Sequence, residues 1–354
     1  MEQYRTFLKR ALAGALSLLA CWALMVIVID PFFHYHTPLF GMKPLVDNER
    51  YQNPGIAEHF EYDSIILGSS MTENFNTDWF DEGFSCDSVK LPFSAARTGS
   101  YHWMMQKAFA TREVKNVFIG LDVDSLISAF GTYFFPLPEY LYDENAFNDV
   151  EYLLNKSVLE PTVNLLKQNV KGTVPPLNTA YSWDEPGIYG KEKALESVTW
   201  DLTRQESTRD CSVFLDNCRE NMEGDILPHI KAHPETDFYI FFPPYSILWW
   251  NLMQNSGETD ARLDTVRQAM ELLLPYENVH LYFFQNDRDT ICNLDNYKDF
   301  NHYSAEISQK IVGWLKDGKG LVTRENYETL LADMRDLALN YDYAALAEEK
   351  AKLG

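Results

Sequence analysis

The protein has 354 residues, of which 46% are hydrophobic and 14% are aromatic. A chain of this length and composition buries the core of one large domain or two small ones, which excludes wholesale disorder. Lys and Arg number 30 against 52 Asp and Glu, so the net charge is −22. Because such a charge repels a phosphate backbone, we expect no nucleic-acid partner.

A hydrophobic run, residues 11–29, contains no charged side chain. In a helix it would span about 30 Å, the thickness of the hydrocarbon core of a bilayer. Three cations precede the run: Arg5, Lys9 and Arg10. We therefore predict a cytoplasmic N-terminus over residues 1–10, a transmembrane helix over residues 11–30, and an extracytoplasmic location for the rest of the chain.

A cleaved signal peptide is the alternative interpretation of this run, and Cys21 resembles a weak lipoprotein-processing site. The run continues to Ile29, well beyond that cysteine. Since the apolar core of a signal peptide usually has about 7 to 15 residues, an uncleaved anchor is favoured. Four further cysteines allow three disulfide pairings, and free thiols are equally expected in a chain of this size: Cys86, Cys211, Cys218 and Cys292.

Residues 31–55 read as a juxtamembrane segment, because prolines and a glycine interrupt any helix there. Beyond it, short runs of β-branched and aromatic residues predict five strands, at residues 63–67, 88–91, 117–121, 238–242 and 279–284. Apolar residues at three- and four-residue spacing predict helices between them, such as residues 101–111 and 259–274. Strands that alternate with helices predict a parallel sheet covered on both faces.

We expect the α/β domain to cover residues 56–316. A stretch rich in Tyr, Phe and Pro breaks the alternation and predicts an insertion at about residues 125–236, and a helical pattern predicts a C-terminal extension over residues 317–354. No metal-binding spacing of His or Cys occurs, so we expect neither a metal nor a cofactor. His34 and His36 follow the predicted membrane helix and are expected at the membrane interface.

Open α/β sheets bind ligands at the carboxyl ends of their strands. Gly68-Ser69-Ser70 follows the first predicted strand, where a serine hydroxyl and backbone N–H groups can meet at one point, as acyl transfer requires. Asp299 precedes His302 by three residues, so its carboxylate can reach Nδ1 of the ring and leave Nε2 for a hydroxyl proton. Taken singly, each residue is better explained as a helix cap or a core residue. Their order and their places at the strand ends favour a Ser-His-Asp triad.

These two motifs resemble those of the SGNH (GDSL-type) hydrolase superfamily, over about residues 56–316. The chain looks most like the membrane-anchored bacterial branch found with cell-surface polysaccharide genes, which is distantly similar to the DltD protein of teichoic acid D-alanylation. The resemblance implies a flavodoxin-like three-layer α/β/α sandwich with a parallel five-stranded sheet in the order 2-1-3-4-5. It also implies that Ser70 is the nucleophile, that Asp299 and His302 complete the triad, and that Ser69 stands in place of the family's aspartate.

Two departures from the family pattern concern the oxyanion hole. The resemblance implies that the N–H of Ser70 is joined by a second N–H after the second strand, and either Ala95 or Gly99 can present it. The family's third motif offers an asparagine side chain, where this chain has Asp122. An ionised carboxylate repels an oxyanion, so Asp122 replaces that donor only if it is protonated.

Tyr245 and Trp249 follow the fourth predicted strand. With Asp122 they are the residues expected to contact substrate, where a ring can stack on a sugar; packing in the core is the alternative. We expect a membrane-anchored, extracytoplasmic serine esterase or O-acyltransferase acting on acyl, chiefly acetyl, esters of a cell-surface or exopolysaccharide glycan. Its expected partners are this glycan, membrane lipid around the N-terminal helix, and a membrane-bound acyltransferase. The alternative, which the missing asparagine favours, is an inactive SGNH-like protein that binds glycan or scaffolds a polysaccharide assembly complex.

Overall fold

The computed structural model describes residues 1–143, 145–203 and 209–353. The chain forms two compact units that alternate along the sequence. The first holds Met1–Glu61 and Pro136–Ala180, and the second holds Tyr62–Phe135 and Tyr181–Gly354. The residues of the predicted insertion, 125–236, are therefore shared between the two units.

The second unit is built on a five-stranded parallel sheet in the order β2-β1-β3-β4-β5, which confirms the predicted α/β fold and strand order. The strands are β1 (Ser64–Leu67), β2 (Ser88–Lys90), β3 (Asn116–Gly120), β4 (Asp237–Phe242) and β5 (Val279–Phe283). In the middle of the sheet, Ile119 pairs with Leu67 on one side and with Ile240 on the other. Every residue of β1 and β3 is buried, so these strands read as hydrophobic runs without alternation.

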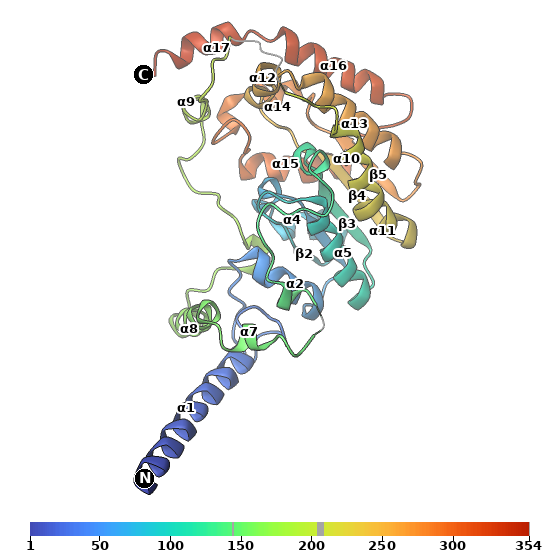
Figure 1. Ribbon diagram of the computed structural model, residues 1–354. Coiled ribbons are helices and arrows are strands. Elements are labelled where there is room, and N and C mark those ends of the chain that lie inside the picture. Colours follow the sequence, from blue (N-terminus) through green and yellow to red (C-terminus); the bar gives the residue numbers. More distant parts are fainter. Residues whose placement is uncertain (144, 204–208, 354) are drawn as a thin grey trace. The chain divides into compact units, whose positions relative to one another are not determined.

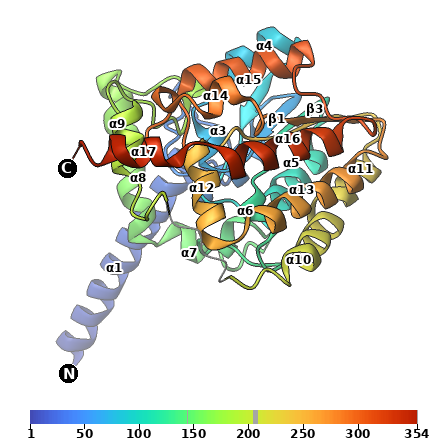
Figure 2. The same ribbon diagram turned by 90° about the horizontal axis from the view of Figure 1, so that it is seen from above.

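Helices cover both faces of this sheet (Figures 1 and 2). On one face, α4 (Thr77–Phe84) packs against α15 (Ala305–Asp317). On the other lie α5 (Thr98–Thr111), α11 (Leu227–Ala232) and α13 (Thr259–Leu273). The unit is therefore the three-layer α/β/α sandwich that the resemblance implies.

Shorter elements complete the second unit. They are α3 (Ser70–Glu73), α6 (Val123–Leu126), α9 (Lys191–Glu196), α10 (Phe214–Asn221), the π-helix η3 (Met222–Ile226), α12 (Ile247–Ser256), α14 (Arg288–Ile291), the 3₁₀-helix η4 (Leu294–Asn296), α16 (Tyr327–Asn340) and α17 (Tyr343–Lys350). The buried face of α16 is formed by Leu331, Met334 and Leu337, and this helix packs on α12 and α13. The C-terminal helical pattern thus forms α16, which packs on the helices that follow β4, and α17, which contacts α9.

The first unit is helical. Its elements are α1 (Glu2–Ile29), α2 (Glu49–His59), η1 (Glu139–Leu141), α7 (Val150–Leu153), α8 (Lys156–Lys171) and η2 (Leu177–Thr179). α1 has a window of mean hydropathy 2.5 of which only 11% is buried, and it is long and apolar enough to cross a membrane. A signal sequence near an N-terminus has the same properties. Only the last turns of α1 pack inward, where Ile29 meets Leu45 and Leu165.

Asp30 ends α1 and fixes the chain that leaves it. The residue is 1% exposed and has a left-handed backbone, with φ of 46°. Its carboxylate accepts hydrogen bonds from the amides of His34, Tyr35 and His36, at 2.7–3.0 Å, and from the Tyr152 hydroxyl at 2.5 Å. One buried carboxylate therefore orders the turn after α1 and ties it to α7.

The two histidines of this turn have protein partners. His34 Nε2 lies 3.3 Å from Asp149 Oδ1, and His36 Nε2 lies 2.8 Å from the carbonyl oxygen of Ile27 in the last turn of α1. Their location at a membrane interface stays a prediction.

Residues 31–55 differ from the sequence-based expectation in one respect, because α2 begins at Glu49 and contains Pro54. A proline has no N–H, so the carbonyl of Arg50 lacks its helical donor. The Tyr142 hydroxyl donates to that carbonyl instead, at 2.8 Å. At Gly55 a Cβ would lie 2.4 Å from the carbonyl oxygen of Phe33, so the helix packs directly on backbone there. Contacts distant in sequence make the helix possible.

We expect Asp30→Ala to destabilise the first unit by about 3 kcal/mol, because it leaves several N–H and O–H donors without their acceptor. The measurement is the rate of protease cleavage within residues 31–48 of the detergent-solubilised full chain, over a urea series. Glu160→Ala, at an exposed position of α8, is the control and should leave cleavage unchanged. Equal cleavage of the Asp30 variant and the wild type would contradict the role of this carboxylate.

Candidate active site

A crevice of about 410 Å³ lies at the carboxyl ends of β1, β3 and β4, within the size range of small-molecule sites. The residues that line it after these strands are Ser69 and Ser70, Asp122 and Asp124, and Tyr245. The loops before α5 and α15 contribute Ala95, Ala96, Arg97, Asn301 and His302, and the remaining lining residues are Ile127, Ser128, Phe134 and Arg209. Polar groups from several strand ends therefore meet in one place.

The turn after β1 depends on two glycines. A Cβ at Gly68 would lie 2.3 Å from Thr72 Cγ2, and a Cβ at Gly120 would lie 2.7 Å from the same atom. Thr72 is fully buried, and its hydroxyl donates to the carbonyl of Ser69 at 2.9 Å. Because this threonine sits between the ends of two strands, α3 starts directly on the sheet and Ser70 in its first turn faces the crevice.

Ser70, His302 and Asp299 form a hydrogen-bonded chain. Ser70 Oγ lies 2.8 Å from His302 Nε2, and His302 Nδ1 lies 2.8 Å from Asp299 Oδ2. An ionised carboxylate only accepts hydrogen bonds, so Nδ1 carries the ring proton and Nε2 accepts from the Ser70 hydroxyl. Ser69 has a different place, because its hydroxyl accepts the amide of Met71 at 3.2 Å and caps α3. The structure thus brings the three predicted triad residues together.

The Asp299 carboxylate is held in its charged form. Burial acts to raise its pKa, but hydrogen bonds from the His302 ring and from the amides of His302 and Asn301 outweigh burial and hold the pKa below its ordinary value. The Asp299 and His302 side chains are each 24% exposed. The turn that carries them is held by Ser246, the N-cap of α12, whose hydroxyl donates to the carbonyl of Phe300 at 2.5 Å.

The two candidates for the second oxyanion N–H occupy different places. Ala95 lines the crevice and has a left-handed backbone, with φ of 52°. Gly99 lies in the first turn of α5, where a Cβ would meet the Tyr133 hydroxyl at 3.1 Å, and it does not line the crevice. Of the two candidates, only Ala95 lines the crevice together with Ser70, and its role as an oxyanion donor stays a prediction.

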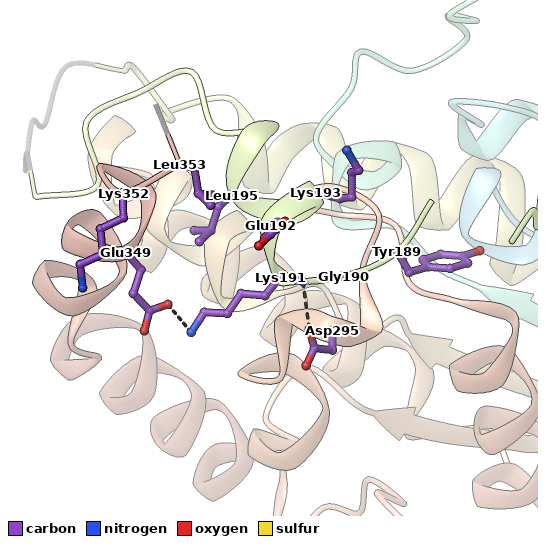
Figure 3. A pocket seen from close by; sticks show the side chains of 10 residues that line it. All are labelled: Tyr189, Gly190, Lys191, Glu192, Lys193, Leu195, Asp295, Glu349, Lys352 and Leu353. Atoms are coloured by element: carbon purple, nitrogen blue, oxygen red, sulfur yellow. Dashed lines mark hydrogen bonds and ion pairs between the residues drawn. The ribbon is translucent and has the colours of Figure 1, made fainter. Parts of the chain in front are cut away.

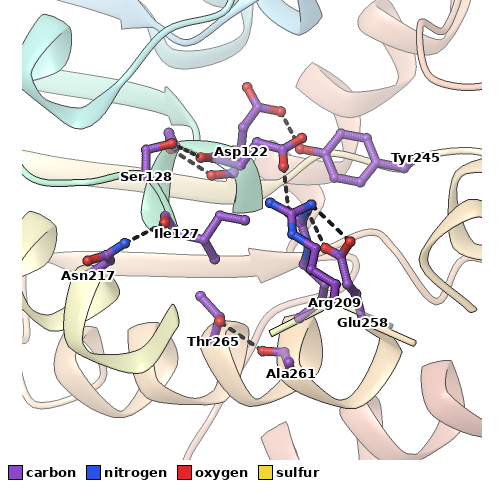
Figure 4. Close-up of polar contacts among 12 residues, drawn as sticks. Asp122, Ile127, Ser128, Arg209, Asn217, Tyr245, Glu258, Ala261 and Thr265 are labelled. Atoms are coloured by element: carbon purple, nitrogen blue, oxygen red, sulfur yellow. Dashed lines mark hydrogen bonds and ion pairs between the residues drawn. The ribbon is translucent and has the colours of Figure 1, made fainter. Parts of the chain in front are cut away.

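Asp122 lines the crevice although it is only 6% exposed. The Tyr245 hydroxyl donates to its Oδ1 (Figure 4), and Oδ2 has no hydrogen-bond partner among the described residues. Burial raises the pKa of Asp122 to about 6. The hydroxyls of Ser69 and Tyr245 act in the opposite direction but do not outweigh burial. Below that pH the carboxyl group carries a proton that it can donate, and above it a negative charge.

Trp249 lies in the core beside the crevice. It is 3% exposed and packs on Tyr245, with ring centroids 4.5 Å apart, and on Trp250 at 4.9 Å. Of the two aromatic residues predicted to contact substrate, only Tyr245 lines the crevice.

Trp183 covers the triad, and no motif or periodic pattern marks it in the sequence. Its ring stands edge-to-face against His302, with centroids 5.5 Å apart, and its indole N–H donates to the carbonyl of Ser70 at 3.3 Å. Asn74 Oδ1 accepts the Trp183 amide at 3.0 Å, and the Lys298 ammonium lies 3.6 Å from the centre of the indole. Trp183 therefore packs against the His302 ring, and it is held there by residues that precede it by 109 and 113 positions in the chain.

A larger cavity of about 580 Å³ lies between α9 and α17 (Figure 3). Among its charged side chains, Lys191 forms an ion pair with Glu349, and Asp295 Oδ1 accepts the Lys191 amide at 3.0 Å. None of its lining residues is Ser, Cys or His. It offers no group for the chemistry of the crevice.

No cluster of three His, Cys, Asp or Glu side chains suited to a metal ion occurs in the described part of the chain. The five cysteines are free thiols, and burial raises the pKa of Cys218 to about 12 and that of Cys86 and of Cys292 to about 11. These thiols are therefore poor nucleophiles, since the thiolate is the reactive form.

No protein-family model and no curated protein matches this chain. Among solved structures, it is similar to a Streptococcus pneumonia protein provisionally named a platelet activating factor. The two share 12% sequence identity with a TM-score of 0.38, over 86% of this chain and 98% of the other.

The raised pKa of Asp122 predicts a pH-dependent stability. The unfolded carboxyl ionises near pH 4 and the folded one near pH 6, so folded protein binds the extra proton between these values and stability falls as pH rises through this window. Above pH 6 the penalty is at most about 3 kcal/mol. We expect Asp122→Asn to melt at a higher temperature than wild type at pH 8, with a gap about half as large at pH 5 and none below about pH 4. A gap that is constant over this range would contradict the raised pKa.

Proposed function

We propose that this chain is a serine esterase or O-acyltransferase of the SGNH type. The observation that carries the proposal is the Ser70–His302–Asp299 chain, whose two hydrogen bonds are each 2.8 Å long. The carboxylate fixes the tautomer that a general base needs, and the nucleophile stands in a crevice that admits a small molecule.

The reaction follows from these positions. Ser70 Oγ attacks the acyl carbonyl while His302 Nε2 takes its proton, and the N–H groups of Ser70 and Ala95 hold the resulting oxyanion. Collapse of this intermediate breaks the ester bond, and the imidazolium returns its proton to the departing alkoxide. Water or a sugar hydroxyl, deprotonated by His302, then takes the acyl group from Ser70. Asp299 orients the imidazole and stabilises the imidazolium.

We further propose that the substrate is an acyl, chiefly acetyl, ester of a cell-surface or exopolysaccharide glycan. In this proposal α1 anchors the chain in the membrane, with a cytoplasmic N-terminus and the catalytic unit outside, and a membrane-bound acyltransferase is a partner. The apolar length of α1 and the cations before it support the anchor and its orientation. The resemblance in the triad motifs supports the substrate class.

A non-catalytic glycan-binding or scaffolding role is the second candidate. Asp122 favours it, because an ionised carboxylate in the crevice opposes an oxyanion. A fluorophosphonate probe on the purified full chain separates the two functions, since only an activated Ser70 becomes labelled.

We expect Ser70→Ala and His302→Ala each to abolish labelling and nearly all turnover of an acetyl ester, because the triad acts as a unit. The double variant should lose little more. Asp299→Asn should lose less than either, and Ser69→Ala, which removes a helix cap and a hydroxyl beside Asp122 but leaves the Ser70–His302 hydrogen bond, should keep its label. Labelling that survives in Ser70→Ala but disappears in Ser69→Ala would show that the nucleophile is the other serine.

We expect Asp122→Asn to raise turnover of a simple acetyl ester several-fold at pH 8 and to change it little at pH 5. The charge that opposes the oxyanion is present only above about pH 6, and a well-placed neutral donor contributes about 3 kcal/mol in enzymes built around one. Turnover across pH 5–8 is the measurement, with Asp124→Asn as a second carboxylate of the same crevice. A loss of turnover at pH 8 without change in melting temperature would overturn this role for Asp122.

A further inference from the structure

We infer that the crevice takes acyl esters carried on an anionic unit, and that Arg97 binds the carboxylate or phosphate group of that unit. This inference rests on the proposed function and names the substrate class of the same site. It comes from the charges that surround Ser70.

Arg97 lines the crevice with an unneutralised guanidinium. Its Nη1 donates to the carbonyl oxygen of Asp124 at 2.7 Å, and the group lies 5.7 Å from the centre of the Phe134 ring. In the ranges that the structure describes, no carboxylate lies within 4 Å of it. The Asp124 carbonyl and the Phe134 ring hold the planar guanidinium in place. Its positive charge and its other N–H groups remain available to a ligand.

The other two arginines at this end of the crevice form ion pairs with carboxylates. Arg262 Nη1 lies 2.5 Å from Asp124 Oδ1, and its Nη2 lies 2.8 Å from Glu258. Arg209 Nη1 lies 2.9 Å from the other oxygen of Glu258, as Figure 4 shows for this pair. These two arginines are matched by these two carboxylates, so among the described residues of the crevice Arg97 is the arginine left without an ion pair. Asp122 also lines the crevice, and its carboxyl group loses its charge below about pH 6.

The position of Arg97 indicates where the anionic group lies. It follows Ala95, the crevice amide, by two residues, which is at most about 7 Å of backbone. A carboxylate or phosphate bound there is therefore close to the acyl group that Ser70 attacks, as on an acetylated sugar whose own ring carries the acid. Because the whole chain has a net charge of −22, an anion approaches only where a local cation outweighs that repulsion.

The test uses the full-length chain in detergent and three matched substrates. They are O-acetylated methyl glucoside, the corresponding glucuronide, and the corresponding 6-phosphate. We expect wild type to have a kcat/KM at least tenfold higher for the two acids than for the neutral sugar at low salt. Arg97→Gln should lose this preference, because its kcat/KM falls far more on the two acids than on the neutral ester. Arg97→Lys should keep part of the preference, and Arg324→Gln, an exposed arginine away from the crevice, should keep all of it. The acid that is preferred distinguishes carboxylate from phosphate.

Equal kcat/KM on all three esters, or a parallel loss on all three in Arg97→Gln, would overturn the inference. Binding of the same compounds to Ser70→Ala, with and without Arg97→Gln, is measured by calorimetry and does not depend on turnover. Selective binding of the acids without fluorophosphonate labelling of wild type would sustain the anion site and refute the catalytic proposal. Labelling without anion preference would do the reverse.

Discussion

The close approach of Thr72 to the ends of two strands is the constraint on which the crevice depends. Gly68 and Gly120 leave no room for a Cβ beside the threonine methyl group, so α3 begins on the sheet itself. With α3 in that place, the Ser70 hydroxyl lies within 2.8 Å of a histidine 232 residues further along the chain. A larger residue at either glycine would push α3 outward and lengthen that hydrogen bond before it disturbed the rest of the sheet.

The parts of this arrangement that could be predicted are those with a local or topological signature. Fully buried parallel strands are hydrophobic runs, which is why β1 and β3 were visible in the sequence. Ligand chemistry follows strand ends, so Ser70 and the Asp299–His302 pair were recognisable by their places in the chain. α2 was not, because Pro54 breaks a helix on local rules and the Tyr142 hydroxyl that compensates comes from a distant segment.

Trp183 and Arg97 show what such signatures cannot reveal. Trp183 belongs to an irregular segment, and its place beside His302 is set by Asn74 and Ser70, which the sequence does not connect to it. Arg97 stands out because the neighbouring arginines form ion pairs with carboxylates and, within the described ranges, it does not. Those ion pairs cannot be read from the sequence, since Arg262 and its partner Asp124 are 138 residues apart. Properties that depend on which partners a charge has found emerge only from the folded chain.

Two buried carboxyl groups, those of Asp299 and Asp122, have pKa values shifted in opposite directions because different hydrogen-bond donors surround them. Asp299 receives consecutive backbone amides and a ring N–H, which together outweigh burial and keep it charged. Asp122 receives the Tyr245 hydroxyl and leaves one oxygen unpartnered, so burial prevails and its pKa rises to about 6. The two therefore differ in charge in mildly acidic solution. In the proposed reaction Asp299 then still orients the base, whereas Asp122 no longer opposes the oxyanion. In the proposed mechanism Asp299 has to be charged and Asp122 acts best when it is neutral. The surroundings of each carboxyl group set this difference in protonation.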